Sequence, residues 1–201
     1  KGTMTLTATN LETSISTRMA VESKENGSVA IPAKILLETL KALPNQLVTF
    51  EADLEQRSLV ITTETGMYKM AVDPPDDFPA LPTSNDAEIM VPVERLMSGI
   101  NYTIFATTSD EMRPAMTGVN VVVDFNKISF VASDGHKLVR YHALGTSTEQ
   151  TGSFVIPKKA MSLLKGATPS EGNVYLKYNK SHAFFRFEET EVICRLINQA
   201  Y

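Results

Sequence analysis

The chain has few of the residues on which many catalytic, metal-binding and secreted proteins depend. Its 201 residues contain no Trp, one Cys and three His. A single thiol cannot close a disulfide within the chain, which fits a reducing, cytoplasmic location. With so few Cys and His residues, scattered along the chain, we expect neither a metal site nor another cofactor. The lone Cys194 stands in an apolar alternating stretch and is predicted to be a small buried hydrophobic residue.

Long apolar runs and an excess of positive charge are also missing. No stretch approaches the roughly 18 apolar residues that cross a bilayer, so no membrane association is expected. The net charge of −4 argues against a uniformly basic surface for nucleic acid, although it leaves room for a locally basic face. The ten Gly residues form no phosphate-binding loop. Hydrophobic residues make up 43% of the chain, which is enough for a sizeable core.

One pattern occurs three times, at intervals of about 60 residues. Each copy opens with an apolar residue and a Pro, which suits the first turn of a helix because Pro lacks an N–H group. Apolar residues then recur at helical spacing. The three predicted helices lie in residues 31–44, 91–107 and 156–169. This period is too long for the common solenoids and favours domains built from two units each.

Three stretches with strand periodicity follow each predicted helix. They are rich in Val, Ile, Phe, Tyr and Thr and are bounded by Asn, Gly, Asp and Ser. The predicted strands are 47–50, 59–63, 67–72, 119–125, 127–132, 137–143, 174–178, 183–187 and 191–197. Two further strands at the head of the chain have no helix before them, and residues 5–16 look like residues 129–140. We therefore expect an incomplete unit at the head, followed by three nearly whole ones.

The best domain boundary lies in residues 73–88, which hold four of the ten Pro residues. Pro stiffens a chain and cannot donate to a strand ladder. The sequence predicts an α+β protein with one domain in residues 1–82, a linker in 83–88 and a second domain in 89–201. Each domain is expected to be a curved antiparallel sheet with two helices packed on one side.

The predicted helices carry more positive than negative charge, in contrast to the whole chain. Their basic residues are Lys34, Lys41, Arg95, Lys158, Lys159 and Lys165, against the acidic residues Glu38 and Glu94. Such a surface can be an ordinary solvated helix face. It can also meet phosphate groups through charge alone. Aromatic residues do not interleave with these lysines, so stacking on single-stranded bases is not expected.

The segment Phe130–Tyr141, FVASDGHKLVRY, brings a Ser, an Asp and a His close together. Ser133, Asp134 and His136 could be interpreted as a hydrolase site. A catalytic triad must converge in space, however, whereas near neighbours on one hairpin point their side chains in different directions. Gly135 permits a tight turn, and Asp134 can cap that turn with its side chain. We therefore predict a turn between two strands and no enzymatic activity.

Six motifs resemble, in order and spacing, the bacterial DNA polymerase III beta subunit family of replicative sliding clamps. They are TLTATNLE, IPAKILLETLKALP, DDFPALP, SDEMRPAMTGV, FVASDGHKLVRY and FVIPKKAMSLLK. The resemblance covers essentially the whole chain. It implies the DNA-clamp fold, in which repeated helix-plus-strand units form curved sheets with the helices on the concave face. In that family three similar domains form each protomer, so the start of the first domain and the whole third domain are expected to be absent here.

The family resemblance implies a non-enzymatic processivity factor. In that family, two protomers close head to tail into a homodimeric ring around double-stranded DNA, without sequence specificity. The resemblance implies that polymerase, clamp-loader and repair proteins dock through short linear motifs in a peptide-binding groove. Beside the hydrolase, a further alternative is an interaction scaffold that has lost DNA binding. A continuous positive strip along the helix side would favour the clamp over this scaffold.

The resemblance also implies the residues of each site. The partner groove is matched by Met116, Ser133, Gly135, His136, Lys137 and Leu138. The DNA-binding set is Lys34, Lys41, Arg95, Asp110, Arg113, Pro114, Ala115, Lys158, Lys159 and Lys165. Pro114 and Ala115 stand where some members have aromatic residues, so stacking on a base is not expected here. Arg113 is expected to neutralise a phosphate instead. The dimer interface is matched by the strand Met67–Val72, with Lys69, Met70 and Val72 as contacts.

Overall fold

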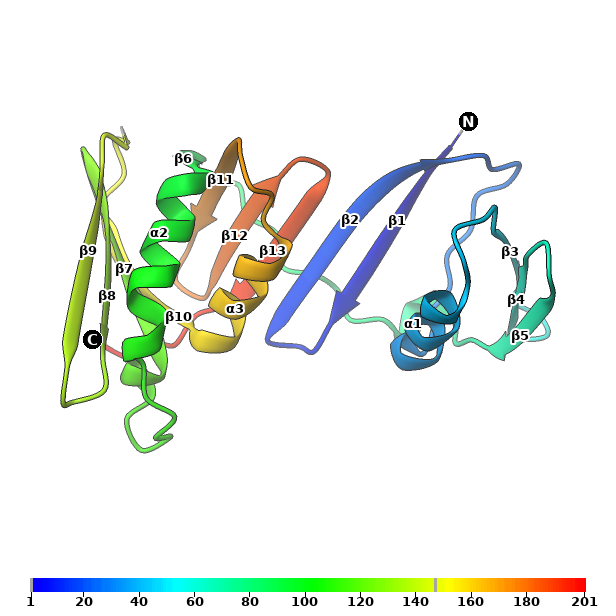
Figure 1. Cartoon of the computed structure of the whole chain (residues 1–201), viewed down its shortest axis with the longest axis horizontal. Helices are drawn as coiled ribbons and strands as arrows, with labels where there is room; N and C mark the ends of the chain where they lie inside the picture. The colour runs from blue at the N-terminus through cyan, green and yellow to red at the C-terminus, as the bar shows by residue number, and fades with distance from the viewer. Residues whose placement is uncertain (1, 147) are drawn as a thin grey trace. The chain divides into compact units, whose positions relative to one another are not determined.

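The described chain forms two compact units. The structure, a computed structural model, describes residues 2–146 and 148–201. Of the described residues, 2–3 and Ala20–Leu81 belong to the first unit, and Met4–Met19 together with Pro82–Tyr201 belong to the second. Figure 1 traces the helices and strands along the chain. No helix in the described ranges is long and apolar enough to cross a membrane.

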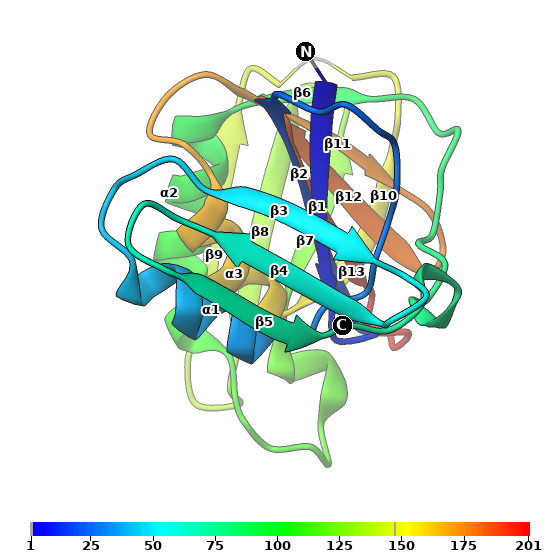
Figure 2. The ribbon, with the colours of Figure 1, turned by 90° about the vertical axis from the view of Figure 1, so that its right-hand side faces the viewer.

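The first unit combines one helix with one small sheet. Helix α1 (Ala33–Ala42) precedes the strands β3 (Thr49–Asp53), β4 (Ser58–Thr62) and β5 (Met67–Ala71). These strands are antiparallel in the order β3-β4-β5 and lie side by side in Figure 2. The buried hydrophobic side chains are Leu59, Ile61, Met70 and Val72.

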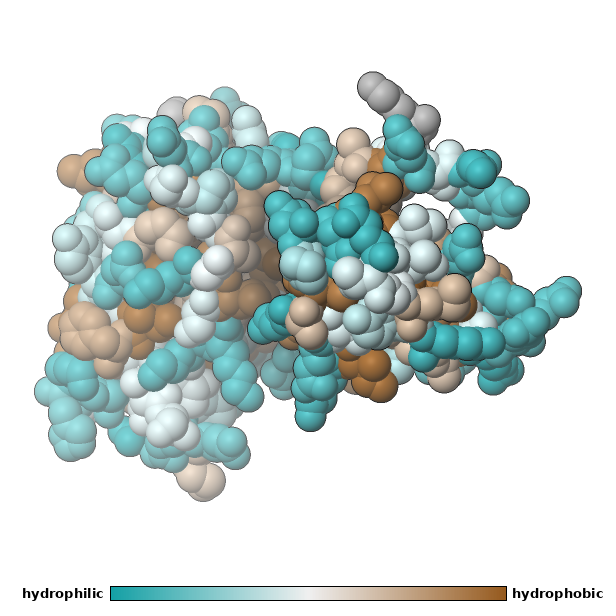
Figure 3. All heavy atoms as spheres, turned by 45° about the vertical axis from the view of Figure 1, so that its right-hand side comes forward, coloured by the Kyte–Doolittle hydropathy of each residue, from teal (hydrophilic) through white to brown (hydrophobic). Residues whose placement is uncertain are grey.

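Many apolar side chains of the first unit remain at its surface. Helix α1 has no buried residue. The exposed large hydrophobic residues of this unit include Ile35, Leu37, Leu40, Leu47, Phe50, Leu54, Met67 and Tyr68. Figure 3 shows apolar side chains, in brown, between hydrophilic ones at the surface of the molecule. A core of four buried side chains therefore supports this unit far less than the larger core supports the second.

Two antiparallel sheets make up the second unit, instead of the single curved sheet that the sequence predicted. One has the strand order β1-β2-β13-β12-β11-β6 and the other β10-β7-β8-β9. The strands of the first sheet are β1 (Gly2–Thr9), β2 (Thr13–Val21), β6 (Ile89–Pro92), β11 (Asn173–Tyr178), β12 (His182–Phe187) and β13 (Thr190–Arg195). Those of the second are β7 (Gly118–Asp124), β8 (Lys127–Ser133), β9 (Leu138–Leu144) and β10 (Gly152–Pro157).

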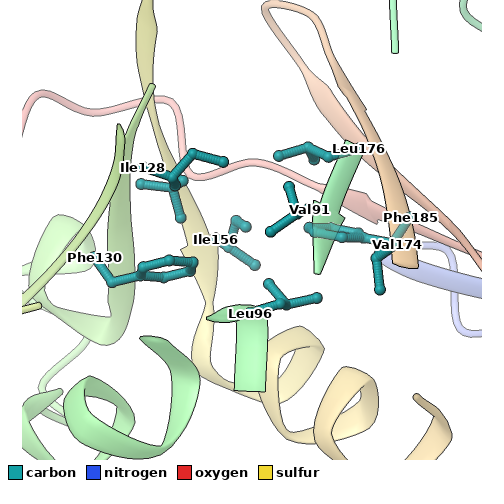
Figure 4. Close-up of a pocket in the computed structure, with 9 residues that line it drawn as sticks. Val91, Leu96, Ile128, Phe130, Ile156, Val174, Leu176 and Phe185 are labelled. Atoms are coloured by element: carbon teal, nitrogen blue, oxygen red, sulfur yellow. The ribbon is translucent and has the colours of Figure 1, made fainter. Parts of the chain in front are cut away.

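The helices α2 (Val93–Thr103) and α3 (Lys158–Ala167) cover the sheets of the second unit. Helix α2 packs on β8 and β9, and α3 packs on β7 and β10. Both lie in front of the strands in Figure 1. Apolar side chains from α2 and from both sheets converge between these layers, as Figure 4 shows for Val91, Leu96, Ile128, Phe130, Ile156, Val174, Leu176 and Phe185. One continuous hydrophobic core therefore holds both halves of the unit together.

The three Pro residues stand one position earlier than predicted. Pro32, Pro92 and Pro157 are the N-cap residues of α1, α2 and α3, with φ between −59° and −55°. At this position, as in the first turn, a missing N–H group leaves no helical hydrogen bond unmade. The predicted helices are confirmed, with ends that differ by a few residues.

The predicted strands are also found, but two more strands were missed. Strands β6 and β10 immediately precede α2 and α3, and they pair with β11 and β7. Each is a short apolar stretch that runs straight into a helix, so its apolar residues merge with the start of the helical pattern. The hairpin at the head of the chain is present, and β2 pairs with β13. Periodicity within a strand does not say which other strand it will pair with.

Candidate functional site

The turn between β8 and β9 is held by the side chain of Asp134. Its Oδ1 atom accepts hydrogen bonds from the backbone N–H groups of His136 and Lys137, each at 3.0 Å. The Ser133 hydroxyl accepts one from the N–H of Gly135 at 3.2 Å. Gly135 has φ +88°, a conformation that side chains disfavour. These contacts confirm that Asp134 caps the turn and that Gly135 permits it.

Charge reinforces the same turn. The ammonium group of Lys137 forms an ion pair with the second carboxylate oxygen of Asp134. This hydrogen bond, followed by those from the two backbone N–H groups, holds the pKa of Asp134 well below its ordinary value. In the described part of the chain, no hydrogen bond joins the His136 ring to Ser133 or Asp134. Asp134 therefore serves the turn and does not orient a catalytic base.

Apolar side chains flank the turn. Leu138 begins β9, pairs with Ser133 and is 68% exposed. Met116 lies in the short 3-10 helix η3 (Pro114–Thr117), which leads directly into β7. Its side chain is partly buried, and its carbonyl oxygen accepts a hydrogen bond from the N–H of Thr108 at 2.9 Å. An exposed Leu and a partly covered Met beside a rigid turn provide the apolar surface that an extended peptide can use.

Arg113 brings the predicted DNA loop next to the predicted partner turn. Its Nε–H donates to the Asp110 carboxylate at 2.9 Å, and its Nη1 lies 4.0 Å from the sulfur of Met116. A Cβ atom added to Gly135 would lie only 2.7 Å from that same Nη1. The hydrogen bond from Arg113, and then one from the N–H of Met112, lowers the pKa of Asp110. The guanidinium is therefore already paired with a carboxylate, which weakens its expected role toward a phosphate.

The last residue of the chain also approaches the turn. Partial burial raises the pKa of Tyr201, and a hydrogen bond with the Ser133 backbone partly offsets that rise. Sequence reasoning missed both Tyr201 and the contact between Arg113 and the turn. The spacing of Asp110 and Arg113, three residues apart, could have indicated their ion pair. Nothing in the sequence pattern could have placed Tyr201 at the turn, because the two are 68 positions apart along the chain.

The predicted DNA-binding lysines are exposed on two helices. Lys34 and Lys41 lie on α1, where Lys34 is 3.9 Å from Glu38. Lys158, Lys159 and Lys165 lie on α3 and are in no ion pair among the described residues. Helix α3 has no acidic residue in its first turn, which begins instead with two lysines. The helix dipole disfavours cations there, so Lys158 and Lys159 are unneutralised lysines at the positive end of a helix, whereas Lys165 lies in its last turn.

The remaining predicted DNA-binding residues are less accessible. Arg95 of α2 is half-buried, and its guanidinium packs against Gly145, where an added Cβ would be 3.1 Å from Nη1. Pro114 and Ala115 are half-buried in η3. These three residues therefore offer less surface than the lysines of α1 and α3.

The predicted interface strand β5 presents other side chains than expected. Met70 and Val72 are only 8% and 3% exposed and belong to the core of the first unit. Side chains alternate along a strand, so Lys69 and Ala71 lie on the exposed side instead. Met70 and Val72 therefore face the core of their own unit, and Lys69 is the exposed residue of the predicted set. β5 is nevertheless an outer strand of its sheet, because in the described residues it pairs with β4 alone.

Comparison with known proteins identifies the family. A model for the DNA polymerase III beta subunit, central domain, matches residues 90–201, and one for the N-terminal domain of the same subunit matches residues 1–82. The chain belongs to the DNA polymerase III beta subunit family. Residues 90–201 alone are more than half of it.

Curated relatives within the beta subunit family are named beta sliding clamp. The one from Staphylococcus epidermidis is 32% identical over 184 residues, which cover 90% of this chain and 48% of that protein. The one from Synechocystis sp. is 28% identical over 222 residues, covering 100% of this chain and 57% of that protein. The chain thus spans about half the length of these relatives.

Solved structures of beta subunits share the fold. A putative DNA polymerase III beta subunit from Eubacterium rectale superposes with a TM-score of 0.92 at 26% identity, covering 100% of this chain and 56% of that one. The DNA polymerase sliding clamp from Bacillus subtilis gives 0.91 at 24% identity, covering 98% and 55%. The chain has the α+β fold of the sliding clamps.

Proposed function

We propose that this chain is part of a sliding clamp that encircles duplex DNA and confers processivity on the replicative polymerase. The main support is that the models of both beta subunit domains match in order along the chain. In addition, the fold superposes on solved clamps with TM-scores of about 0.9. In this proposal the protein has no enzymatic activity of its own. It acts in the cytoplasm, and the whole protein forms a head-to-tail homodimer.

The proposed domain arrangement follows the sequence. Residues 1–82 form part of the first clamp domain, residues 83–88 a linker, and residues 89–201 the second domain. The ranges matched by the two family models support this division. Within the proposed dimer interface, the outer strand β5 supplies its backbone edge and the side chain of Lys69.

In the proposed function, helix lysines of each unit meet phosphate groups of DNA. They are the exposed cations Lys34 and Lys41 of α1 in the first unit and Lys158, Lys159 and Lys165 of α3 in the second, with a smaller contribution from Arg95, Asp110, Arg113, Pro114 and Ala115. Phosphate contacts carry no sequence information. Two lysines stand in the first turn of α3, where the helix dipole disfavours positive charge. Because this placement does not stabilise the helix itself, it supports a role in meeting phosphate groups.

The proposed partner groove uses the β8–β9 turn. Ser133, Gly135, His136, Lys137 and Leu138, together with Met116, form part of a site for short linear motifs of polymerase, clamp-loader and repair proteins. The hydrogen-bonded turn and the exposed Leu138 beside it support this assignment. Burial of one apolar anchor contributes roughly 1.5–3 kcal/mol, so we expect binding in the millimolar range for this chain alone.

Duplex binding by this 201-residue chain tests the proposal. Fluorescence anisotropy with two unrelated 20-base-pair duplexes should show equal, weak affinities that fall steeply as salt is raised. Tight binding that depends on the duplex sequence would contradict the clamp. Complete absence of binding at low salt would favour a scaffold that has lost its DNA contact.

A further inference from the structure

Arg113 occupies a position between the two proposed sites. Its guanidinium touches the Met116 sulfur and fills the space beside Gly135 that a side chain at that position would need. Both neighbours belong to the proposed partner groove, whereas Arg113 itself comes from the proposed DNA loop. The side chain of Arg113 therefore faces the turn, and the question is what keeps it there.

The carboxylate of Asp110 holds Arg113 in this place. One oxygen, Oδ2, accepts the Nε–H of Arg113 at 2.9 Å, while the other, Oδ1, accepts the N–H of Met112 at 3.0 Å. The Asp110 carbonyl oxygen also accepts the N–H of Arg113 at 3.1 Å. Asp110 thus binds the loop backbone and the guanidinium at once, which limits the rotamers that the long Arg side chain can adopt.

We propose that Asp110 is a positioning residue for the partner groove, because it holds the Arg113 guanidinium beside Gly135 and Met116, where the remaining N–H groups face an incoming peptide. This inference rests on the proposed partner-binding function of the turn. A guanidinium carries five N–H donors in a fixed plane, and Nε supplies one of them to Asp110. One N–H of Nη1 points at the Met116 sulfur, and those that remain are suited to backbone carbonyl oxygens of an extended peptide whose apolar side chains contact Met116 and Leu138.

Substitutions at positions 110 and 113 can distinguish the geometry of the Asp110–Arg113 contact from its charge. A Lys at position 113 would keep the positive charge but could not bind Asp110 through Nε while donating sideways toward the turn. An Asn at position 110 would keep the Oδ1 acceptor for Met112 but would replace the oxygen that binds Arg113 with an N–H₂ group. Asp110→Asn and Arg113→Lys should therefore impair the same function, although only the first removes a negative charge.

The matched control is the neighbouring carboxylate. Glu111 is exposed and is in no ion pair or side-chain hydrogen bond in the described parts of the chain. Glu111→Gln removes the same charge one residue away and leaves the Asp110–Arg113 contact intact. Equal losses in Asp110→Asn and Glu111→Gln would overturn the proposal in favour of a general effect of charge.

The experiment is an NMR titration of the 201-residue chain with the capped neutral peptide Ac-Ser-Leu-Ser-Leu-NH₂. Before peptide is added, the Arg113 Nε–H should be protected from exchange in the wild type and in Glu111→Gln, and should lose protection in Asp110→Asn. Peptide affinity should fall about threefold to tenfold in Asp110→Asn and in Arg113→Lys, as expected for the loss of one hydrogen bond of ordinary strength. Glu111→Gln should stay within about twofold of the wild type, since it breaks no such bond.

Two negative outcomes differ in meaning. Wild-type binding with unchanged affinity in Asp110→Asn would overturn the role of Asp110 and leave the proposed partner groove standing. A protected Nε–H in the wild type without any peptide-induced shift at Met116 or Gly135–Leu138 would overturn the groove and, with it, this role. Unchanged backbone shifts away from residues 108–118 would establish that each variant is folded.

Discussion

Gly99 of α2 lies directly against the ring of Phe130 on β8. A Cβ atom added at Gly99 would be 2.4 Å from two ring carbons, closer than any real contact of that kind. Phe130 is fully buried in the core of the second unit, so its ring cannot swing into solvent. The approach of α2 to the sheet therefore depends on this glycine.

We expect Gly99→Ala to destabilise the protein. The added methyl group must displace a buried ring, and such overpacking costs about 1–3 kcal/mol of unfolding free energy. The measurement is urea unfolding followed by circular dichroism. The control is Gly166→Ala in α3, where nothing lies within 4 Å of the added Cβ. There the higher helix propensity of Ala should stabilise by up to about 1 kcal/mol, and a loss as large as that of Gly99→Ala would contradict the steric argument.

Removing the lysines of α3 should weaken duplex binding without destabilising the fold. For the triple variant Lys158→Gln, Lys159→Gln and Lys165→Gln, the slope of log affinity against log salt should fall by about 0.9 per lost phosphate contact. Anisotropy over a series of salt concentrations measures that slope. The control Lys127→Gln removes a lysine that is paired with Asp124 at 3.5 Å. A slope unchanged in the triple variant would remove α3 from the DNA surface.

The Asp134 carboxyl should titrate well below an ordinary aspartate. Its pKa is lowered in the folded chain, first by Lys137 and then by two backbone N–H groups. A lowered pKa means that this contribution to the turn is fully present above the ordinary pKa of Asp and is lost as pH falls through the lowered value. The contribution of Asp134 to the turn should therefore be insensitive to pH between about 5 and 8, where an ordinary Asp is already ionised.

Substitution of Lys137 tests which contact contributes most to the lowered pKa of Asp134. In Lys137→Met, the pKa of Asp134 should rise, yet stay below its ordinary value because the N–H groups of His136 and Lys137 still donate. The pKa of Asp134 is measured from its carboxyl ¹³C chemical shift recorded against pH. An unchanged pKa in this variant would show that the backbone alone is responsible.

Leu138→Asp should abolish peptide binding at the turn. A charged side chain would remove the exposed apolar anchor and place an acid beside the peptide. The control is Leu144→Asp, at the other end of the same strand, where the exposed fraction of the Leu is 65% against 68% for Leu138. Chemical-shift mapping with the capped peptide distinguishes the two. Equal binding by both variants, or equal loss, would place the peptide somewhere other than the turn. Asp134→Asn should affect the turn itself and should have little effect on peptide binding beyond it.

The sequence by itself determined the helices, most strands and the β8–β9 turn. These features depend on neighbours in the chain: Pro before a helix, apolar residues at helical or alternating spacing, and an Asp followed by Gly. The identity of the family could also be recognised from the order of its motifs. For the turn, even the capping role of Asp134 could be predicted, because the contacts of this side chain span only three residues.

Only the tertiary structure decided which strands pair and which side chains meet. The pairing of β2 with β13 joins residues more than 170 positions apart, and no local pattern encodes such a choice. Met70 and Val72 have the apolar character of an interface, but alternation and the neighbouring helix direct them into the core. Arg113 looked like a free cation in the sequence. Its pairing with Asp110 and its approach to Gly135 depend on how the loop folds back onto the turn, which is a property of three-dimensional packing.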